Sequence, residues 1–223
     1  MAFIVIEGLD GSGKSTQMKM LRDYFSGKKI DFEYLHFPRM EAPVFGELVA
    51  RFLRGELGKI DEVDPYIVAL LYAGDRKAAA VEIQTWLDNG KLVLLDRYVY
   101  SNIAYQCAKI DDSQGKEKLR DWILNMEYNY FGIPVPDINI YLDAPFDFVK
   151  KNLESQRHGD DRDYLKGSID IHEASMNFQE KVRQVYLSLE GKEKNYSIIK
   201  CYNEKQEMLK AEEVFEKILG KIK

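Results

Sequence analysis

The sequence contains few of the residues that build metal centres and disulfide frameworks. Its 223 residues include only two cysteines, Cys107 and Cys201, and three histidines, His36, His158 and His172. None of them has the close spacing of a zinc site, and no C-x-x-C redox motif occurs. We therefore expect two reduced, packed thiols and no transition metal held by the protein.

An excess of positive charge and long apolar runs are also missing. The 32 lysines and arginines are outnumbered by 37 aspartates and glutamates, so the net charge is −5. This balance leaves no broad basic field for a nucleic-acid backbone, and any anion has to be met by individually placed cations. No apolar run reaches the length of a membrane span, and no basic segment with an apolar core opens the chain. We expect a cytoplasmic protein with neither nucleic-acid nor membrane partners.

What the sequence does contain is a regular alternation of strand and helix patterns. The composition, 45% hydrophobic and 31% charged, is that of a globular protein, and the length allows one large core. Strand patterns occur at residues 3–6, 33–37, 92–95, 138–142 and 196–199. Helical patterns follow the first strand and then occur at residues 43–55, 65–89, 101–109, 116–131, 146–156, 171–189 and 204–222. This alternation predicts one α/β domain over residues 1–223, with a five-stranded parallel sheet between two helical layers.

A glycine-rich motif joins the first strand to the first helix. It reads Gly8-Leu9-Asp10-Gly11-Ser12-Gly13-Lys14-Ser15-Thr16. The spacing G-x-x-x-x-G-K-[ST] is that of a P-loop, whose backbone N–H groups surround phosphate oxygens at a helix N-terminus. Lys14 would reach the outer phosphates, and the Ser15 hydroxyl would hold Mg²⁺. The motif predicts a binding site for a nucleoside triphosphate that is bound together with Mg²⁺.

The helix expected at residues 65–89 has one continuous apolar stripe. Its members are Ile67, Leu70, Leu71, Gly74, Ala78 and Val81, and we expect this stripe to face the core. Tyr72 and Arg76 lie four residues apart on the opposite face. Together they offer an aromatic plate and a hydrogen-bond donor, which suit a nucleobase.

Charged side chains also follow two of the predicted strands. Arg39 comes just after the second strand, and Asp96 and Arg97 end the third. Carboxyl ends of parallel strands meet at one edge, where the P-loop also lies. Guanidinium groups bind phosphate well, so we expect Arg39 and Arg97 to hold the phosphate of a second substrate. Asp96 would either hold Mg²⁺, in part through water, or cap the next helix.

These motifs, in this order, resemble the thymidylate kinases, a family of P-loop nucleoside-monophosphate kinases. The resemblance extends over residues 3–186 and is carried by Gly8 to Thr16, Phe37-Pro38-Arg39, Leu71-Tyr72-Ala73-Gly74-Asp75-Arg76, Asp96-Arg97-Tyr98 and the segment 157–173. It implies an enzyme that converts dTMP and ATP into dTDP and ADP, and it implies a homodimer. It also implies that thymine stacks on Tyr72 and accepts from Arg76. The further dTMP contacts that it implies are Asp10 at the sugar, Tyr105 beside the 2′ position, Phe37 and Ser101.

The segment 157–173 resembles the lid of these enzymes. Some members of the family carry a catalytic arginine in the P-loop, at the position of Gly11, and others carry arginines in the lid. Because Gly11 has no side chain, the resemblance places this chain in the second group. It implies that Arg157 is catalytic, with Arg162 as the alternative, and that Glu173 is the acidic residue of the lid.

Two other functions remain open from the sequence. One is a related kinase that acts on another nucleoside monophosphate or on a nucleoside. The other is a nucleotide-dependent switch protein, in which loops order around a bound triphosphate. The nearest segment to a guanine-reading Asn-Lys-x-Asp motif is Asn203-Glu204-Lys205, which does not match it.

Overall fold

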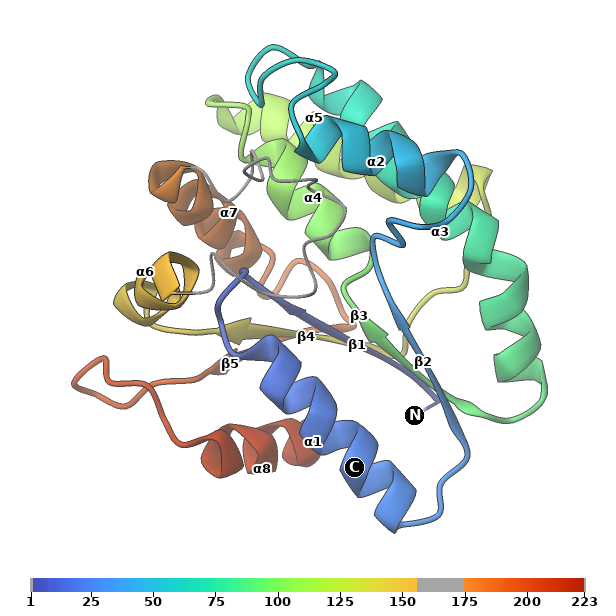
Figure 1. Cartoon of the computed structure of the whole chain (residues 1–223), viewed down its shortest axis with the longest axis vertical. Helices are drawn as coiled ribbons and strands as arrows, with labels where there is room; N and C mark the ends of the chain where they lie inside the picture. The colour runs from blue at the N-terminus through green and yellow to red at the C-terminus, as the bar shows by residue number, and fades with distance from the viewer. Residues whose placement is uncertain (1, 156–174, 223) are drawn as a thin grey trace.

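A central parallel sheet lies between two layers of helices (Figure 1). The structure is a computed structural model and describes residues 2–155 and 175–222. The strands are β1 (Phe3–Gly8), β2 (Phe32–His36), β3 (Leu92–Asp96), β4 (Ile138–Asp143) and β5 (Tyr196–Lys200). The helices are α1 (Lys14–Gly27), α2 (Phe45–Leu53), α3 (Pro65–Asp88), α4 (Val99–Cys107), α5 (Ser113–Leu124) with the π-helical turn η1 (Asn125–Tyr130), α6 (Phe146–Ser155), α7 (Met176–Ser188) and α8 (Ala211–Ile222). The strand order is β2-β3-β1-β4-β5, and every pair is parallel, so the predicted fold class is confirmed.

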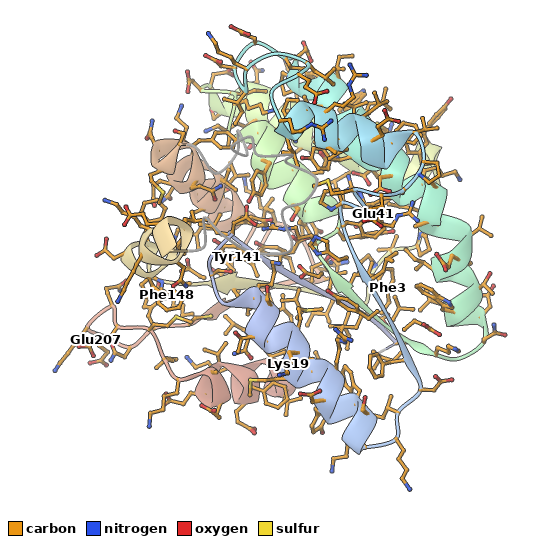
Figure 2. All side chains as sticks on the ribbon, viewed as in Figure 1. Phe3, Lys19, Glu41, Tyr141, Phe148 and Glu207 are labelled. Atoms are coloured by element: carbon orange, nitrogen blue, oxygen red, sulfur yellow. The ribbon has the colours of Figure 1, made fainter. Side chains whose placement is uncertain are left out.

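The central strand β1 sends alternate side chains into the two layers. Ile4 and Ile6 pack in the cluster formed with α1 and α8, whereas Phe3 and Val5 pack in the larger cluster below α3, α4 and α7. All four side chains are buried, as the two-residue period of a strand requires when both faces are covered. Figure 2 shows Phe3 inside the molecule, while Glu207 extends from its surface.

The parallel pairing brings distant segments to one edge of the sheet. Ile6 of β1 pairs with Asp96 of β3, and His36 of β2 pairs with the same Asp96. The P-loop leaves β1 two residues later, and Arg97 leaves β3 beside it. The carboxyl ends of β1, β2 and β3 therefore form the floor of a site, as is usual for open parallel sheets.

The apolar stripe that we expected to bury α3 is largely exposed, so that prediction was wrong. Ile67 is 55% exposed and Val81 is 76% exposed, and Leu70 also reaches solvent. The buried face instead consists of Val68, Ala69, Ala73, Gly74, Asp75, Arg76, Ala79, Ala80 and Ile83. The small alanines let α3 lie close to α4 and β3. Both faces carry apolar residues at helical spacing, so periodicity alone did not distinguish them.

Several boundaries also differ from the prediction. The terminal helix begins at Ala211 and not at Glu204, because the preceding residues form a loop closed by a bridge between Tyr202 and Met208. The predicted lid, with Arg157, Arg162 and Glu173, lies outside the described residues. None of the helices in the described ranges is long and apolar enough to span a bilayer.

Candidate active site

Glycines shape the loop between β1 and α1. Gly11 and Gly13 have φ angles of 75° and 85°. Residues with a Cβ atom rarely adopt such positive values, whereas glycine adopts them readily. A Cβ on Gly11 would also lie 3.0 Å from the Val149 carbonyl oxygen of α6, so no larger residue fits there without movement. Gly13 directly precedes α1, whose first N–H groups have no partners within the helix. The loop therefore offers the backbone donors that a phosphate requires.

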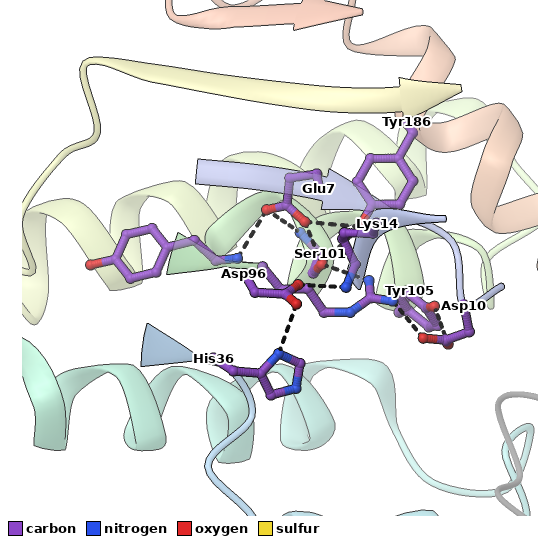
Figure 3. Close-up of polar contacts among 10 residues, drawn as sticks. Glu7, Asp10, Lys14, His36, Asp96, Ser101, Tyr105 and Tyr186 are labelled. Carbon is purple, nitrogen blue, oxygen red and sulfur yellow. Dashed lines mark hydrogen bonds and ion pairs between the residues drawn. The ribbon is translucent and has the colours of Figure 1, made fainter. Parts of the chain in front are cut away.

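Lys14 lies in the first turn of α1 and reaches across to β3. Its Nζ donates to Asp96 Oδ1 at 2.5 Å, and His36 Nδ1 lies 3.3 Å from Asp96 Oδ2 (Figure 3). Burial opposes ionisation of Asp96, but Lys14 and His36 outweigh it and hold the pKa of this carboxyl well below its usual range. The possibility that Asp96 caps α4 is wrong, because Tyr98 occupies the cap position.

Two oxygen ligands suitable for Mg²⁺ lie in this region. Ser15 is exposed in the first turn of α1, and both Ser15 and Asp96 line the same cavity. Hydroxyl and carboxylate oxygens are hard ligands of the kind that Mg²⁺ prefers. Within the described part of the chain, no group of three or more His, Cys, Asp or Glu side chains could hold a metal by itself. A magnesium ion here would therefore depend on nucleotide phosphates for most of its ligands.

Arg97 connects β3 to the P-loop. Its Nη2 donates to Asp10 Oδ1 at 2.6 Å, its Nη1 donates to Ser101 Oγ at 3.1 Å, and Tyr105 OH donates to Asp10 Oδ2 at 2.9 Å. The φ of Arg97 is 67°, a value that is uncommon for residues other than glycine. Its backbone N–H donates a hydrogen bond to the Ile6 carbonyl at 3.0 Å. Burial opposes the charged form of Arg97, but Tyr105 and Asp10 outweigh it and raise the pKa of the guanidinium. Arg97 is thus a charged and fixed group at the base of the site.

Glu7, which the sequence interpretation missed, organises the residues around Arg97. Its carboxylate is fully buried and accepts from the Tyr98 N–H at 3.0 Å, from Ser101 Oγ at 2.5 Å and from Tyr186 OH at 3.1 Å. Burial raises the pKa of Glu7, and the bonds from Ser101 and the charge of Arg97 offset only part of this effect. A glutamate inside an apolar strand, directly before a P-loop, was the signal that could have identified it.

Arg39 is fixed to α3. Its Nε donates to Asp75 Oδ1 at 2.9 Å, its backbone N–H donates to Asp75 Oδ2 at 2.8 Å, and its Nη2 donates to the Asp75 carbonyl at 2.8 Å. The guanidinium carbon also lies 5.7 Å from the centre of the Phe37 ring. These contacts hold the planar group at the wall of the site.

One cavity of about 1140 Å³ brings nearly all of the predicted residues together. Its lining includes Leu9, Asp10, Gly11, Gly13, Lys14, Ser15, Thr16, Phe37, Arg39, Tyr72, Arg76, Asp96, Arg97, Ser101 and Tyr105. Of the predicted site residues in the described ranges, only Gly8 and Ser12 lie outside the lining. The volume exceeds that of a typical site for one small ligand, which agrees with two substrates that meet in one space.

Sequence analysis overlooked two polar residues of the same wall. Asn102 and Gln106 follow Ser101 and Tyr105 along α4 and line the cavity. Both side chains are buried, and both retain polar atoms without partners among the described residues. Their signal was the presence of two amides in an otherwise apolar buried helix.

A P-loop and two anchored arginines line a single cavity, which is the arrangement of a P-loop enzyme that binds phosphorylated ligands. The model of the thymidylate kinase family matches residues 6–212. Similar proteins include a probable thymidylate kinase of Pyrococcus horikoshii, 36% identical over 84% of this chain and 82% of its own. The thymidylate kinase of Mycobacterium tuberculosis is 32% identical over 83% of this chain and 84% of its own. The solved structure of the Candida albicans thymidylate kinase superposes with a TM-score of 0.71 at 28% identity, over 98% of this chain and 89% of that one.

The chain belongs to the thymidylate kinase family. This result confirms the resemblance seen in the sequence motifs. Membership of this family makes the chain a kinase that phosphorylates a nucleoside monophosphate.

Proposed function

We propose that this protein transfers the γ-phosphoryl group of ATP to dTMP and forms ADP and dTDP. The observation that carries the proposal is the shared cavity, in which the P-loop Lys14 and the anchored Arg39 and Arg97 line one space. Phosphoryl transfer needs its two anions held together by cations and requires little covalent help from the protein. The reaction takes place in the cytoplasm with ATP and dTMP as partners, and it needs neither nucleic acid nor a membrane.

The P-loop side of the cavity binds ATP. The backbone from Gly8 to Thr16 surrounds the phosphates, and Lys14 moves its ammonium from Asp96 to their outer oxygens. Ser15 and Asp96 would hold Mg²⁺ together with the phosphates, in part through water. An ion bound there would supply positive charge that offsets the charge of the transferred phosphates.

The opposite side binds dTMP. Arg97 and Arg39 hold the 5′-phosphate, one of whose oxygens attacks the γ-phosphorus as the bond to the bridging oxygen of ADP breaks. Tyr72 and Phe37 lie along the base, Arg76 donates to it, and Asp10, Ser101 and Tyr105 surround the sugar and phosphate. Most of these side chains are already held in place by hydrogen bonds, which lowers the cost of ordering them on binding.

The catalytic charge in the transition state comes from the lid. Arg157 supplies it, with Arg162 as the alternative, and Glu173 belongs to the same segment. Gly11 supports a catalytic arginine in the lid and not in the P-loop. The space beside Gly11 is filled by α6, which leaves no room for an arginine at that position.

A substrate panel tests the reaction. ADP release is measured with ATP, Mg²⁺ and each of dTMP, dUMP, dCMP, dGMP, UMP and thymidine. We expect kcat/KM to be highest for dTMP. A higher value for another acceptor would establish a different kinase, and nucleotide binding without acceptor-dependent ADP release would revive the switch protein.

The homodimer that the family resemblance implies also belongs to this proposal. Ile67, Leu70, Ala78 and Val81 form an exposed apolar stripe on α3, which suits a second copy of the chain. Val81→Glu places a charge in this face, and Val135→Glu changes another exposed valine outside it. Light scattering after gel filtration should give a dimer for the wild type and Val135→Glu and a monomer for Val81→Glu. A monomeric wild type would refute this part of the proposal.

A further inference from the structure

The Asp96 carboxylate, at the end of β3, has a different partner at each of its two oxygens. Lys14 of α1 donates to Oδ1 at 2.5 Å, and Nδ1 of His36 lies 3.3 Å from Oδ2, within reach of a hydrogen bond (Figure 3). The Asp96 side chain is only 6% exposed, whereas that of His36, at the end of β2, is 47% exposed. A carboxylate buried to this degree is costly unless donors satisfy it, so each contact stabilises its charge.

The backbone places His36 directly beside Asp96. The two residues are partners in the parallel register of β2 and β3, and the Phe37 N–H donates to the Asp96 carbonyl at 3.0 Å. Both side chains line the same cavity. His36 therefore approaches Asp96 from a neighbouring, hydrogen-bonded strand, whereas Lys14 reaches it through a flexible four-carbon chain.

Nucleotide binding would affect these two contacts differently. In the proposed reaction the Lys14 ammonium passes from Asp96 to the outer phosphates, which releases Oδ1. The same step leaves His36 at Oδ2, because its ring belongs to β2 and not to the P-loop. Oδ1 would then be the open oxygen of a carboxylate whose other oxygen is still held. It would remain on the side of α1, where Ser15 also lines the cavity.

We infer that His36 is a positioning residue for Asp96, and that it holds Oδ2 so that Oδ1 is presented to Mg²⁺ bound with the nucleotide. The inference rests on the proposed function and specifies how its donor site is assembled. Partners of this kind commonly orient carboxylates that bind metals. Imidazole suits the role because Nδ1 carries an N–H in the charged form and in one neutral form. A histidine that only ended β2 would not need this contact, since a half-exposed ring can be satisfied by water.

Metal-dependent nucleotide binding tests this inference without turnover. The β,γ-imido analogue of ATP is titrated into the whole chain by calorimetry, once with Mg²⁺ and once with EDTA. The quantity compared is the metal ratio, the Kd with EDTA divided by the Kd with Mg²⁺. His36→Phe keeps an aromatic ring and removes both nitrogens. We expect it to lower the metal ratio by about 10-fold, the lower end of the usual effect of losing such a partner.

His36→Asn is the conservative variant. The asparagine amide carries an N–H the same number of bonds from the backbone as Nδ1 of histidine, so it can still donate to Oδ2. Its metal ratio should stay within about 2-fold of the wild-type value, because the carboxylate keeps its partner. His36→Ala removes the ring and the donor together and should match His36→Phe.

A double variant shows whether His36 acts through Asp96. Asp96→Asn should itself lower the metal ratio, and adding His36→Phe to it should lower the ratio no further, because the group that His36 holds has already been altered. Tyr34→Phe is the matched control. It removes one polar atom from another residue of β2 that lines the cavity, two positions from His36, and its metal ratio should equal that of the wild type.

Three results would overturn the inference: an unchanged metal ratio in His36→Phe and His36→Ala, an equal fall in His36→Asn, or a further fall when His36→Phe is added to Asp96→Asn. An equal fall in Tyr34→Phe would also overturn it, since any change in β2 would then have the same effect. No monophosphate is present in these titrations. A protein that gives the expected ratios but phosphorylates no dTMP would therefore refute the proposed function and leave this inference standing.

Discussion

Replacing Lys109 by methionine should stabilise the fold, most strongly at neutral and acidic pH. Lys109 lies just beyond α4, and its buried Nζ has no hydrogen-bond partner among the described residues. It lies 4.7 Å from the centre of the Phe52 ring of α2. Burial lowers the pKa of Lys109 to about 7 from its ordinary 10.5, and the charge of Asp64 offsets this only in part.

The sign and size of the effect follow from this pKa. Between pH 7 and pH 10.5 the unfolded chain binds a proton that the folded chain does not, so wild-type stability rises with pH over this range. A pKa difference of this size means that the charged Lys109 destabilises the folded state by at most about 5 kcal/mol. The full destabilisation applies below pH 7, and it disappears above pH 10.5. Buried sites relax around a charge, so we expect about 1–3 kcal/mol at pH 6. Methionine fills the same space without a charge.

Urea denaturation at pH 6, 8 and 9.5 measures this effect. Lys109→Met should be more stable than the wild type at pH 6, and the difference should shrink toward pH 9.5. Lys118→Met, which changes an exposed lysine of α5, should follow the wild type at every pH. Equal pH dependence in Lys109→Met and the wild type, or a loss of stability at pH 6, would refute the reasoning.

Two further predictions concern the reaction. Lys14→Ala should reduce turnover by about 10³-fold or more while circular dichroism stays unchanged, because the outer phosphates lose their cation; persistent activity would exclude the P-loop from the chemistry. Arg157→Ala should lower kcat by about 10³-fold with a smaller effect on KM, as expected for a group that acts in the transition state. A near-normal kcat in Arg157→Ala together with a low kcat in Arg162→Ala would transfer that role to Arg162.

Local patterns were sufficient to predict the fold and the floor of the site. The alternation of strand and helix periods defined the parallel sheet, since each pattern reflects burial of one segment against its neighbours. The P-loop and the arginines after two strands could be placed together because parallel strands end at one edge. The structure then brought Arg39 and Arg97 into the same cavity as Lys14.

The side chains that fix these groups could not be predicted in the same way. Glu7 meets Tyr186, and Glu127 meets Arg76, across long separations in sequence, so no local spacing reveals the pairs. The buried face of α3 escaped prediction for another reason. Alanines can pack closely where larger side chains cannot, and hydrophobicity alone favoured the face with isoleucine, leucine and valine, which proved to be exposed.

Three cations expected to bind phosphate, all in the described part of the chain, have carboxylate counter-ions: Asp96 for Lys14, Asp75 for Arg39 and Asp10 for Arg97. We therefore expect phosphate binding at these positions to exchange one anion for another, because the cations are already neutralised by carboxylates. Chloride and other monoanions compete weakly, because they replace a hydrogen-bonded carboxylate with a poorer ligand. A phosphate would compete better because it offers more oxygens, and the carboxylate that it displaced would become available to the rest of the nucleotide. For Asp10, that released acceptor lies beside Tyr105, where a sugar hydroxyl can take the place of the arginine.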